Sequence, residues 1–222
     1  LGDSGKTEPA KETTIIANGI NSLIHSNKTL ENTNKTLADR NRDLEAMADD
    51  YKLYQKNMFL QSILSGSREI DDSITERLRH YNINIGEDAY YVIFAISIDN
   101  YQEYLKAYTE RQQNLMSIYI DGIVADMVFK QHQGFNLEMK TNEMIVTICL
   151  DSSKSPDEVK SIAYNLAFKL HSEITDNLNY TITLGVSTPG KGISTIQECY
   201  NESTAAVNYR LLQGYNSVIL FE

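Results

Sequence analysis

The residues Tyr90 to Ile98, which read YYVIFAISI, are the stretch that decides the fold of this chain. They form a nearly continuous run of aliphatic and aromatic side chains. A strand with one face in water alternates between apolar and polar residues, whereas a run without alternation is typical of a central strand that is buried on both faces. We therefore predict a sheet that is covered on both sides.

The segments after this strand alternate between helical and extended patterns. The four residues Lys140-Thr141-Asn142-Glu143 separate two strand-like runs, as in a hairpin. Ser155 followed by Pro156 is typical of a helix start, with Ser155 as the N-cap. Because the order is βαββαβαβ, the sequence predicts an α/β fold, an α+β sandwich with a central, mostly antiparallel sheet and flanking helices. The predicted elements are a helix over Leu105–Lys130, strands over Phe135–Met139 and Met144–Leu150, a helix from Pro156 to Ile174, a strand over Tyr180–Val186, a helix over Ser194–Leu212 and a strand over Ser217–Phe221.

A seven-residue repeat marks the first third of the chain. Apolar residues recur at positions that we label d, and the positions three residues earlier, labelled a, include three successive asparagines. Sustained heptads predict a left-handed coiled coil, and Asn at a pairs across a parallel two-stranded seam and fixes its register. The d positions are Ile16, Leu23, Leu30, Leu37, Leu44, Tyr51 and Met58, and the a positions are Ile20, Asn27, Asn34, Asn41, Ala48 and Gln55. The predicted dimerisation seam consists of Ile20, Leu23, Asn27, Leu30, Asn34, Leu37, Asn41, Leu44 and Tyr51.

An amphipathic helix that packs on its own globular domain is the alternative interpretation of these heptads. Such a helix carries a broader stripe, with three or four apolar positions in every two turns. The stripe from Leu23 to Leu44 is narrow, with only Leu at d, which favours a parallel homodimer. We therefore expect a disordered linker over residues 1–14, a coiled-coil signalling helix over 15–66, a connector helix over 67–86 and the α/β domain over 87–222.

The composition argues against several functions. The net charge of −10 argues against direct nucleic-acid binding by this segment, since neutralising phosphates requires clustered Lys and Arg. No run approaches the roughly 18 consecutive apolar residues that span a bilayer. The two cysteines and four histidines show no metal-ligand spacing, and the cysteines fit reduced thiols. We expect a cytoplasmic segment without a metal site.

The order of elements, with a hairpin between the second and third strands, resembles the GGDEF (diguanylate cyclase) fold, which is nucleotidyl-cyclase-like. In that family the first strand ends in Asp-x-Asp-x-Phe-Lys, and the matching stretch here runs from Ser97 through Asp99 to Gln102. The family's hairpin reads Gly-Gly-Asp/Glu-Glu-Phe, and here it reads Lys140-Thr141-Asn142-Glu143-Met144. Ser97 and Asn142 therefore stand where the resemblance implies metal-binding acids, and Glu143 is retained.

These departures from the family pattern bear on activity. Mg²⁺ neutralises charge during phosphoryl transfer and prefers carboxylate ligands, so that Ser97 and Asn142 are poor replacements. Paired glycines let a backbone approach a phosphate closely, which Lys140 and Thr141 allow less freely. By comparison with the family, we predict that the chain is not an enzyme, that it has no catalytic residue and that it needs no cofactor.

Three further stretches resemble the degenerate GGDEF-like regions of membrane-bound AraC-type transcription regulators. They are the helix Asn57–Gly66, the strand pattern Ile182–Ser187 and the helix Tyr200–Arg210. The resemblance implies a bacterial parent with an extracellular sensor and membrane spans before Leu1, and a helix-turn-helix DNA-binding domain after Glu222. The absence of an initiator Met agrees with a fragment of such a protein.

The residues and the resemblance together support two functional hypotheses. The first is a non-catalytic signal-relay and dimerisation region, in which paired helices pass a membrane signal toward a DNA-binding domain that lies outside this chain. The alternative is a catalytically inactive GGDEF-like module that still binds a nucleotide or a cyclic dinucleotide near Asp99 and Glu143.

Overall fold

A computed structural model describes residues 8–68, 71, 73–140 and 142–222 of the chain. The contacts divide it into two compact units, Leu1–Gln55 and Lys56–Glu222. Within the described residues, no helix is both long and apolar enough to cross a membrane.

The first unit is formed by helix α1, which spans Glu8–Leu64 and so reaches into the second unit as well. The helix also includes residues 8–14, which the sequence assigned to the linker; residues 1–7 of that linker lie outside the described residues. The d-position leucines of this unit, Leu23, Leu30, Leu37 and Leu44, are between 50 and 67 % exposed. The apolar stripe predicted from the heptads is therefore uncovered in a single copy of the chain.

The second unit begins with the last turns of α1, whose side chains are part of its core. Phe59, Leu60, Ile63 and Leu64 are at most 3 % exposed. The helix ends before Gly66, whose φ of 68° suits a residue without a Cβ. Helix α2, Ser73–His80, follows, within the segment expected to be a connector.

The sheet of the second unit has the predicted, mostly antiparallel arrangement. Its strands are β1 (Tyr90–Ile98), β2 (Gln133–Lys140), β3 (Glu143–Leu150), β4 (Ile182–Val186), β5 (Gly190–Lys191) and β6 (Val218–Leu220). Their order is β2-β3-β1-β4-β6, and β5 pairs with β1. Only the β4–β6 pairing is parallel among the described strands. A long N-terminal helix followed by a mixed sheet with flanking helices is the predicted fold class.

The helical segment predicted over Leu105–Lys130 is divided in the structure. Tyr108 is extended, and Thr109 starts a new helix because its backbone N–H donates to Oε1 of Gln112 at 2.9 Å. The helices after β1 are α3 (Tyr101–Ala107), α4 (Glu110–Val124) with a π-helical continuation (Ala125–Phe129), α5 (Pro156–Asn177), α6 (Ile196–Asn208) after a short 3₁₀ turn (Ile193–Thr195), and α7 (Arg210–Gln213).

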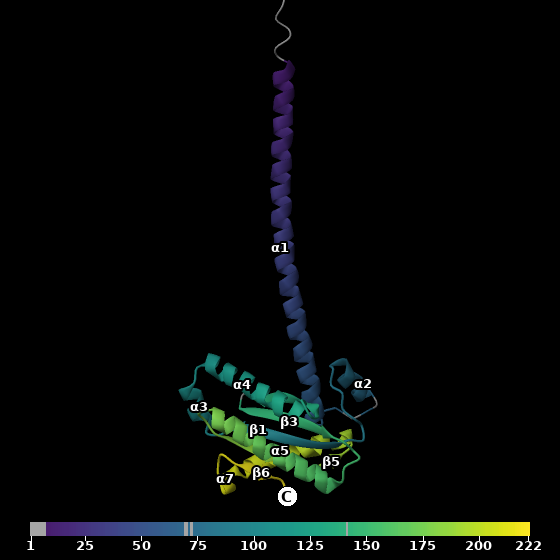
Figure 1. The fold of residues 1–222 in the computed structure, drawn as a ribbon, viewed down its shortest axis with the longest axis vertical. Helices are drawn as coiled ribbons and strands as arrows, with labels where there is room; N and C mark the ends of the chain where they lie inside the picture. The colour runs from purple at the N-terminus through teal and green to yellow at the C-terminus, as the bar shows by residue number, and fades with distance from the viewer. Residues whose placement is uncertain (1–7, 69–70, 72, 141) are drawn as a thin grey trace, which may run out of the picture. The chain divides into compact units, whose positions relative to one another are not determined.

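Strand β1 separates two hydrophobic cores, as its unbroken apolar run predicts. Side chains at alternate positions point to opposite faces of a sheet. Tyr90, Val92, Phe94 and Ile96 belong to the core under α4 and α5. Tyr91, Ile93 and Ala95 belong to the core formed with the end of α1, α2 and α6. The helices therefore cover both faces of the sheet (Figure 1).

Gly185 lets β4 and α6 approach each other closely. A Cβ added to Gly185 would lie 2.2 Å from the carbonyl oxygen of Ser203 and 2.8 Å from the backbone nitrogen of Val207. Both atoms are backbone, so neither can rotate away. The glycine in the Ile182–Ser187 pattern is therefore required by packing.

Replacing Gly185 by Ala should lower the free energy of unfolding by about 1–3 kcal/mol, the usual effect of overpacking a core. Chemical denaturation followed by circular dichroism measures this change. Gly86→Ala is the matched control, because its added Cβ would meet the nearest atom at an ordinary 3.5 Å. Equal stability of the Gly185→Ala and Gly86→Ala variants would contradict the packing argument.

Candidate functional site

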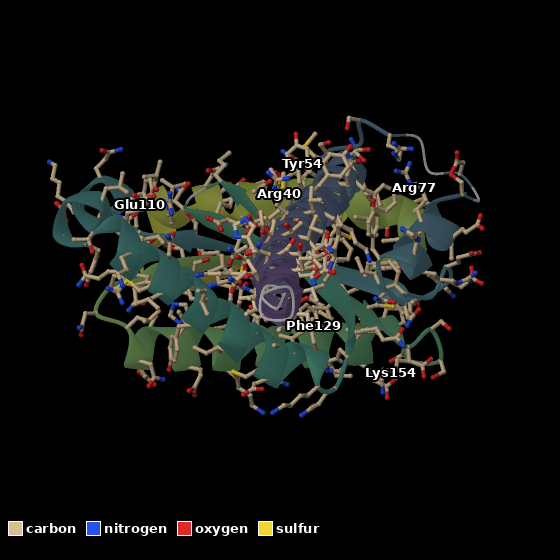
Figure 2. All side chains as sticks on the ribbon, turned by 90° about the horizontal axis from the view of Figure 1, so that it is seen from above. Arg40, Tyr54, Arg77, Glu110, Phe129 and Lys154 are labelled. Carbon is tan, nitrogen blue, oxygen red and sulfur yellow. The ribbon has the colours of Figure 1, made fainter. Side chains whose placement is uncertain are left out.

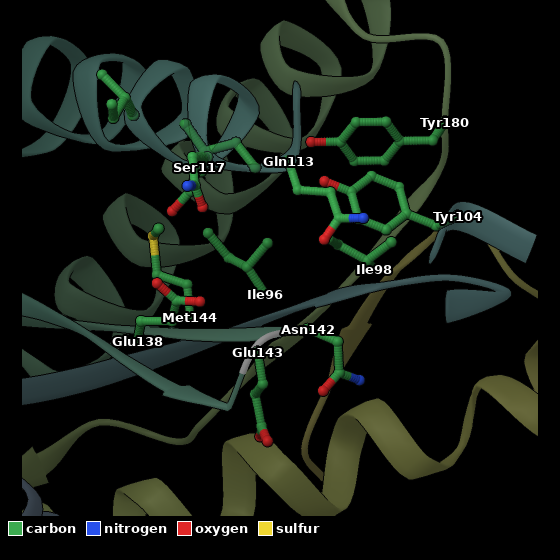
Figure 3. Close-up of a pocket in the computed structure, with 13 residues that line it drawn as sticks. Ile96, Ile98, Tyr104, Gln113, Ser117, Glu138, Asn142, Glu143, Met144 and Tyr180 are labelled. Carbon is green, nitrogen blue, oxygen red and sulfur yellow. The ribbon is translucent and has the colours of Figure 1, made fainter. Parts of the chain in front are cut away.

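A cavity of about 390 Å³ lies where the end of β1 and the β2–β3 hairpin meet α4. Its floor is apolar, and its polar walls come from α4, from β2 and from the hairpin (Figure 3). The lining residues are Ile96, Ile98, Tyr104, Gln113, Asn114, Ser117, Ile118, Ile120, Glu138, Asn142, Glu143, Met144 and Tyr180. A concave, mostly apolar site with a few polar groups is the usual form of a small-molecule site.

Tyrosines form one end of the cavity. The ring centroids of Tyr104 and Tyr180 lie 5.0 Å apart, and those of Tyr104 and Tyr108 lie 5.1 Å apart. Burial raises the pKa of Tyr180 and of Tyr104, so both hydroxyls stay protonated. The Tyr180 hydroxyl is buried and has no hydrogen-bond partner among the described residues. Gln113 also lines the cavity, and its Nε2 donates to the backbone oxygen of Tyr108 at 2.8 Å. This end of the cavity is therefore aromatic, with the side chains of Tyr104 and Tyr180 in its lining.

The Glu138 carboxyl group lies on the opposite side of the cavity, and Asp121 is a charged neighbour of Glu138 that does not itself line the cavity. Burial, and after it the negative charge of Asp121, raise the pKa of Glu138, while a hydrogen bond with Ser117 lowers it. Burial also raises the pKa of Asp121, whose Oδ1 accepts from Nδ2 of Asn136 at 2.7 Å. A carboxyl group with a raised pKa binds a proton more readily than a free one.

The hairpin brings the predicted Glu143 next to β1. Ser97 pairs with Glu143 in the antiparallel ladder, and Ile96 pairs with Met144. Glu143 is only 12 % exposed, and its carboxylate lies 3.3 Å from Nζ of the exposed Lys140. Figure 3 shows Asn142 and Glu143 pointing away from the tyrosines. Of the predicted hairpin positions, Thr141 lies outside the described residues, and Met144 is buried in the core under α4 and α5.

Asp99, the other acid that the sequence singled out, is the centre of a buried hydrogen-bond network. Its side chain is fully buried, and its Oδ1 accepts from Oγ1 of Thr183 at 2.8 Å. Its Oδ2 accepts from the backbone N–H of Asn216 at 2.9 Å. Nη1 of Arg210 lies 3.5 Å from Oδ1 and donates to Oγ of Ser97 at 3.0 Å. The network joins β1 to β4, to α7 and to the turn before β6.

The resemblance to the GGDEF family implies a divalent cation at this end of the sheet, and the residues present do not fit one. Mg²⁺ needs several oxygen ligands with free lone pairs. Both Asp99 oxygens already accept hydrogen bonds, and Ser97 accepts from the Arg210 guanidinium. No group of three His, Cys, Asp or Glu residues that could hold a metal occurs in the described part of the chain. Arg210 thus supplies the positive charge beside Asp99.

Sequence reasoning missed most of the residues that build this region. Arg210, Thr183 and Asn216 had no assigned role, although Arg210 ends one of the stretches that carried the resemblance. From the sequence, the cavity residues Gln113, Ser117 and Glu138 were predicted only to be parts of a helix and a strand. Arg210, which follows the uncharged residues 203–209, was the available signal for the Asp99 network, because a buried charge needs a partner of opposite sign.

Replacing Arg210 by Leu should lower the free energy of unfolding by about 2 kcal/mol, because Asp99 is then left buried without its charged partner. Denaturant unfolding of the full chain measures the loss. Lys130→Met is the control, since it removes an exposed ion pair with Asp126, and surface pairs contribute little. Asp99→Asn in the Arg210→Leu background should recover part of the stability. No difference between the Arg210→Leu and Lys130→Met variants would contradict the buried-pair interpretation.

The chain was compared with known proteins in three ways. No protein-family model matches it, and no curated protein matches it. Among solved structures it is similar to the active GGEEF domain of a diguanylate cyclase from Vibrio cholerae, at 15 % identity and a TM-score of 0.45, covering 68 % of this chain and 88 % of that chain. It is also similar to the coiled coil and GGDEF domain of DgcB from Caulobacter crescentus, at 10 % identity and a TM-score of 0.49, covering 83 % and 96 %.

A third similar structure is the diguanylate cyclase SiaD from Pseudomonas aeruginosa, at 12 % identity and a TM-score of 0.45, covering 96 % of this chain and 84 % of that chain. The GGDEF-like fold predicted from the sequence is supported. An AraC-type or membrane-bound parent is not shown by these comparisons.

These comparisons contradict the prediction that the chain is not an enzyme. The similar structures are those of diguanylate cyclases, and one of them is an active domain. The prediction rested on Ser97, Lys140 and Asn142. These residues differ from the family's metal ligands and from its paired glycines, but their identity does not give the rate of catalysis. Similarity at 10 to 15 % identity concerns the arrangement of helices and strands.

Proposed function

We propose that the chain is a signal-relay and dimerisation region, in which residues 16–58 pair with a second copy as a parallel coiled coil. The uncovered leucine stripe of α1 carries this proposal. Leucines exposed by 50 % or more at four successive d positions need a partner to leave water, and burying such a side chain contributes roughly 1.5–3 kcal/mol. The asparagines at a supply the register.

The continuity of α1 supports the relay. The same helix carries the stripe and then Phe59, Leu60, Ile63 and Leu64, which are buried beside the sheet of the second unit. A shift of the paired helices would therefore move side chains inside the core. Polar residues at the a positions weaken the seam. Two arrangements of the paired helices of residues 16–58, which we call the stalk, then differ in free energy by only a few kcal/mol.

The resemblance to membrane-bound AraC-type regulators supports a more specific form of this proposal. In that form, a sensor upstream of this chain shifts the helices, and the GGDEF-like units of a dimer pass the change to DNA-binding domains downstream. The role is then transcription regulation at a cell membrane, with this segment on the cytoplasmic side.

Replacing both Leu30 and Leu37 by Asp should convert a dimer into a monomer, because four charges would then meet at the paired seam. Light scattering of the full chain at tens of micromolar measures the mass. Asn32→Asp with Thr36→Asp is the matched control, since these positions lie outside the seam. A native chain that is monomeric would contradict the predicted dimerisation seam. A control variant whose dimer dissociates to the same extent would contradict it as well.

The cavity favours a second function, the binding of a nucleotide or cyclic dinucleotide. Its tyrosine rings and the side-chain oxygen of Gln113, whose Nε2 donates to the backbone oxygen of Tyr108, suit a planar heterocycle that forms hydrogen bonds.

Calorimetry with GTP and with cyclic di-GMP, each with and without Mg²⁺, tests this second function. We expect heat of binding that Gln113→Ala reduces and that Asn165→Ala, on the exposed side of α5, leaves unchanged. Chromatography of the same mixtures separates binding from turnover. No heat at high micromolar ligand would end this hypothesis.

A further inference from the structure

Helix α4 carries a second apolar face that nothing in the described part of the chain covers. Its inner face, with Ile120, Ile123 and Val124, is buried in the core. On the outer face Leu115, Ile118 and Tyr119 are 57, 65 and 43 % exposed. Exposed apolar residues are normal when single, whereas a contiguous stripe marks an interaction surface.

The spacing of these residues places them on one face together with Gly122. Positions 115, 118, 119 and 122 follow the i, i+3, i+4, i+7 pattern of a helix face. Figure 2 marks the ends of α4 and its π-helical continuation with Glu110 and Phe129. A hollow of about 790 Å³ lies along this face, and it is lined by these four residues together with Ile123, Ala125, Asp126, Met127 and Glu173 of α5. A Cβ added to Gly122 would meet nothing within 4 Å, so the surface is open at that point.

The stripe is symmetric about its centre. Leu115 lies three residues before Ile118, and Gly122 lies three residues after Tyr119. Arg111 lies seven residues before Ile118, and Asp126 lies seven residues after Tyr119. When two copies of the helix lie antiparallel about this centre, Leu115 of each copy therefore lies opposite Gly122 of the other. Arg111 of each copy lies opposite Asp126 of the other.

We propose that the outer face of α4 is a self-docking surface, on which α4 of a second copy packs antiparallel about a two-fold axis between Ile118 and Tyr119. An isologous contact requires that if residue i meets residue j, j also meets i. In this arrangement Leu115 fills the space at Gly122 of the second copy, and Ile118 packs on Tyr119 of the second copy. Glycine lets the helices approach closely, as at other helix crossings.

Charge complementarity supports a second copy as the occupant. Arg111 is exposed, and no carboxylate pairs with it among the described residues. The antiparallel contact places it opposite Asp126 of the second copy, and the symmetry forms this pair twice. Asp126 pairs at 2.8 Å with Lys130 in the single copy, but both groups are more than two-thirds exposed, so that pair competes weakly.

This surface belongs to the second unit and is independent of the stalk. The two contacts can be separated in the full chain, because the Leu30→Asp and Leu37→Asp changes lie in the first unit. We call the chain with both changes the stalk-disrupted chain. If the stalk proposal is wrong, the native chain is monomeric at tens of micromolar. If the α4 proposal is wrong, the stalk-disrupted chain stays monomeric at hundreds of micromolar.

Sedimentation equilibrium of the stalk-disrupted chain at hundreds of micromolar tests the surface. We expect a monomer–dimer equilibrium whose dissociation constant rises roughly three- to tenfold with Arg111→Glu or with Asp126→Arg. The double change Arg111→Glu with Asp126→Arg should restore the original constant, which misfolding could not do. A stalk-disrupted chain that stays monomeric, or a double change no better than the single ones, would overturn the proposal.

Cross-linking of the otherwise native chain gives a second test. Ile118→Cys places thiols of two copies on either side of the axis, so mild oxidation should link them. Cys149 and Cys199 are buried and do not compete. Asn165→Cys, exposed on α5, is the matched control and should remain unlinked. Equal yields for the two variants would refute the antiparallel contact.

Discussion

The burial of β1 on both faces is the constraint on which the rest of the second unit depends. A strand without a polar face needs an apolar layer on each side, and two separate stretches of sequence supply them. Helices α4 and α5 cover one face, while the last turns of α1, with α2 and α6, cover the other. Helix α1 carries the heptad stripe and, in its last turns, supplies core residues of the second unit.

The same strand sets the chemistry at its end. Ser97 lies near the end of the buried run and Asp99 directly follows it, and both are buried where β1 meets the hairpin and β4. A buried carboxylate in such a place needs either a cation or several donors. Here Thr183, Asn216 and Arg210 supply the donors and the positive charge, which closes the C-terminal segment onto the sheet. The cavity is lined by amide, hydroxyl and carboxyl groups, of which Gln113 donates to the backbone oxygen of Tyr108 and Glu143 pairs with Lys140.

Local signals in the sequence were sufficient for most of the elements. The heptads of α1, the capping Ser155 and the hairpin between β2 and β3 depend on neighbours in the chain, and all three appear in the structure. The break at Tyr108 was missed because the apolar spacing continues across it, and the signal was the Thr109–Gln112 pair, which is short and common. The prediction that the chain is not an enzyme was wrong for a different reason. It was inferred from the residues at two family motifs, and the identity of these residues does not give the rate of a reaction.

The sequence by itself therefore determined local patterns along the chain. These are the seven-residue stripe of α1, the unbroken apolar run of β1 and the order of strands and helices. These features arise from hydrophobic spacing along one segment, which can be read without knowing what lies opposite. Only the tertiary structure decided that Arg210 meets Asp99 across more than a hundred residues and that Leu115, Ile118 and Tyr119 are exposed. It also decided that the buried Tyr180 hydroxyl has no hydrogen-bond partner among the residues that the structure describes. Pairing and exposure are relations between distant segments, and they exist only once the chain has folded.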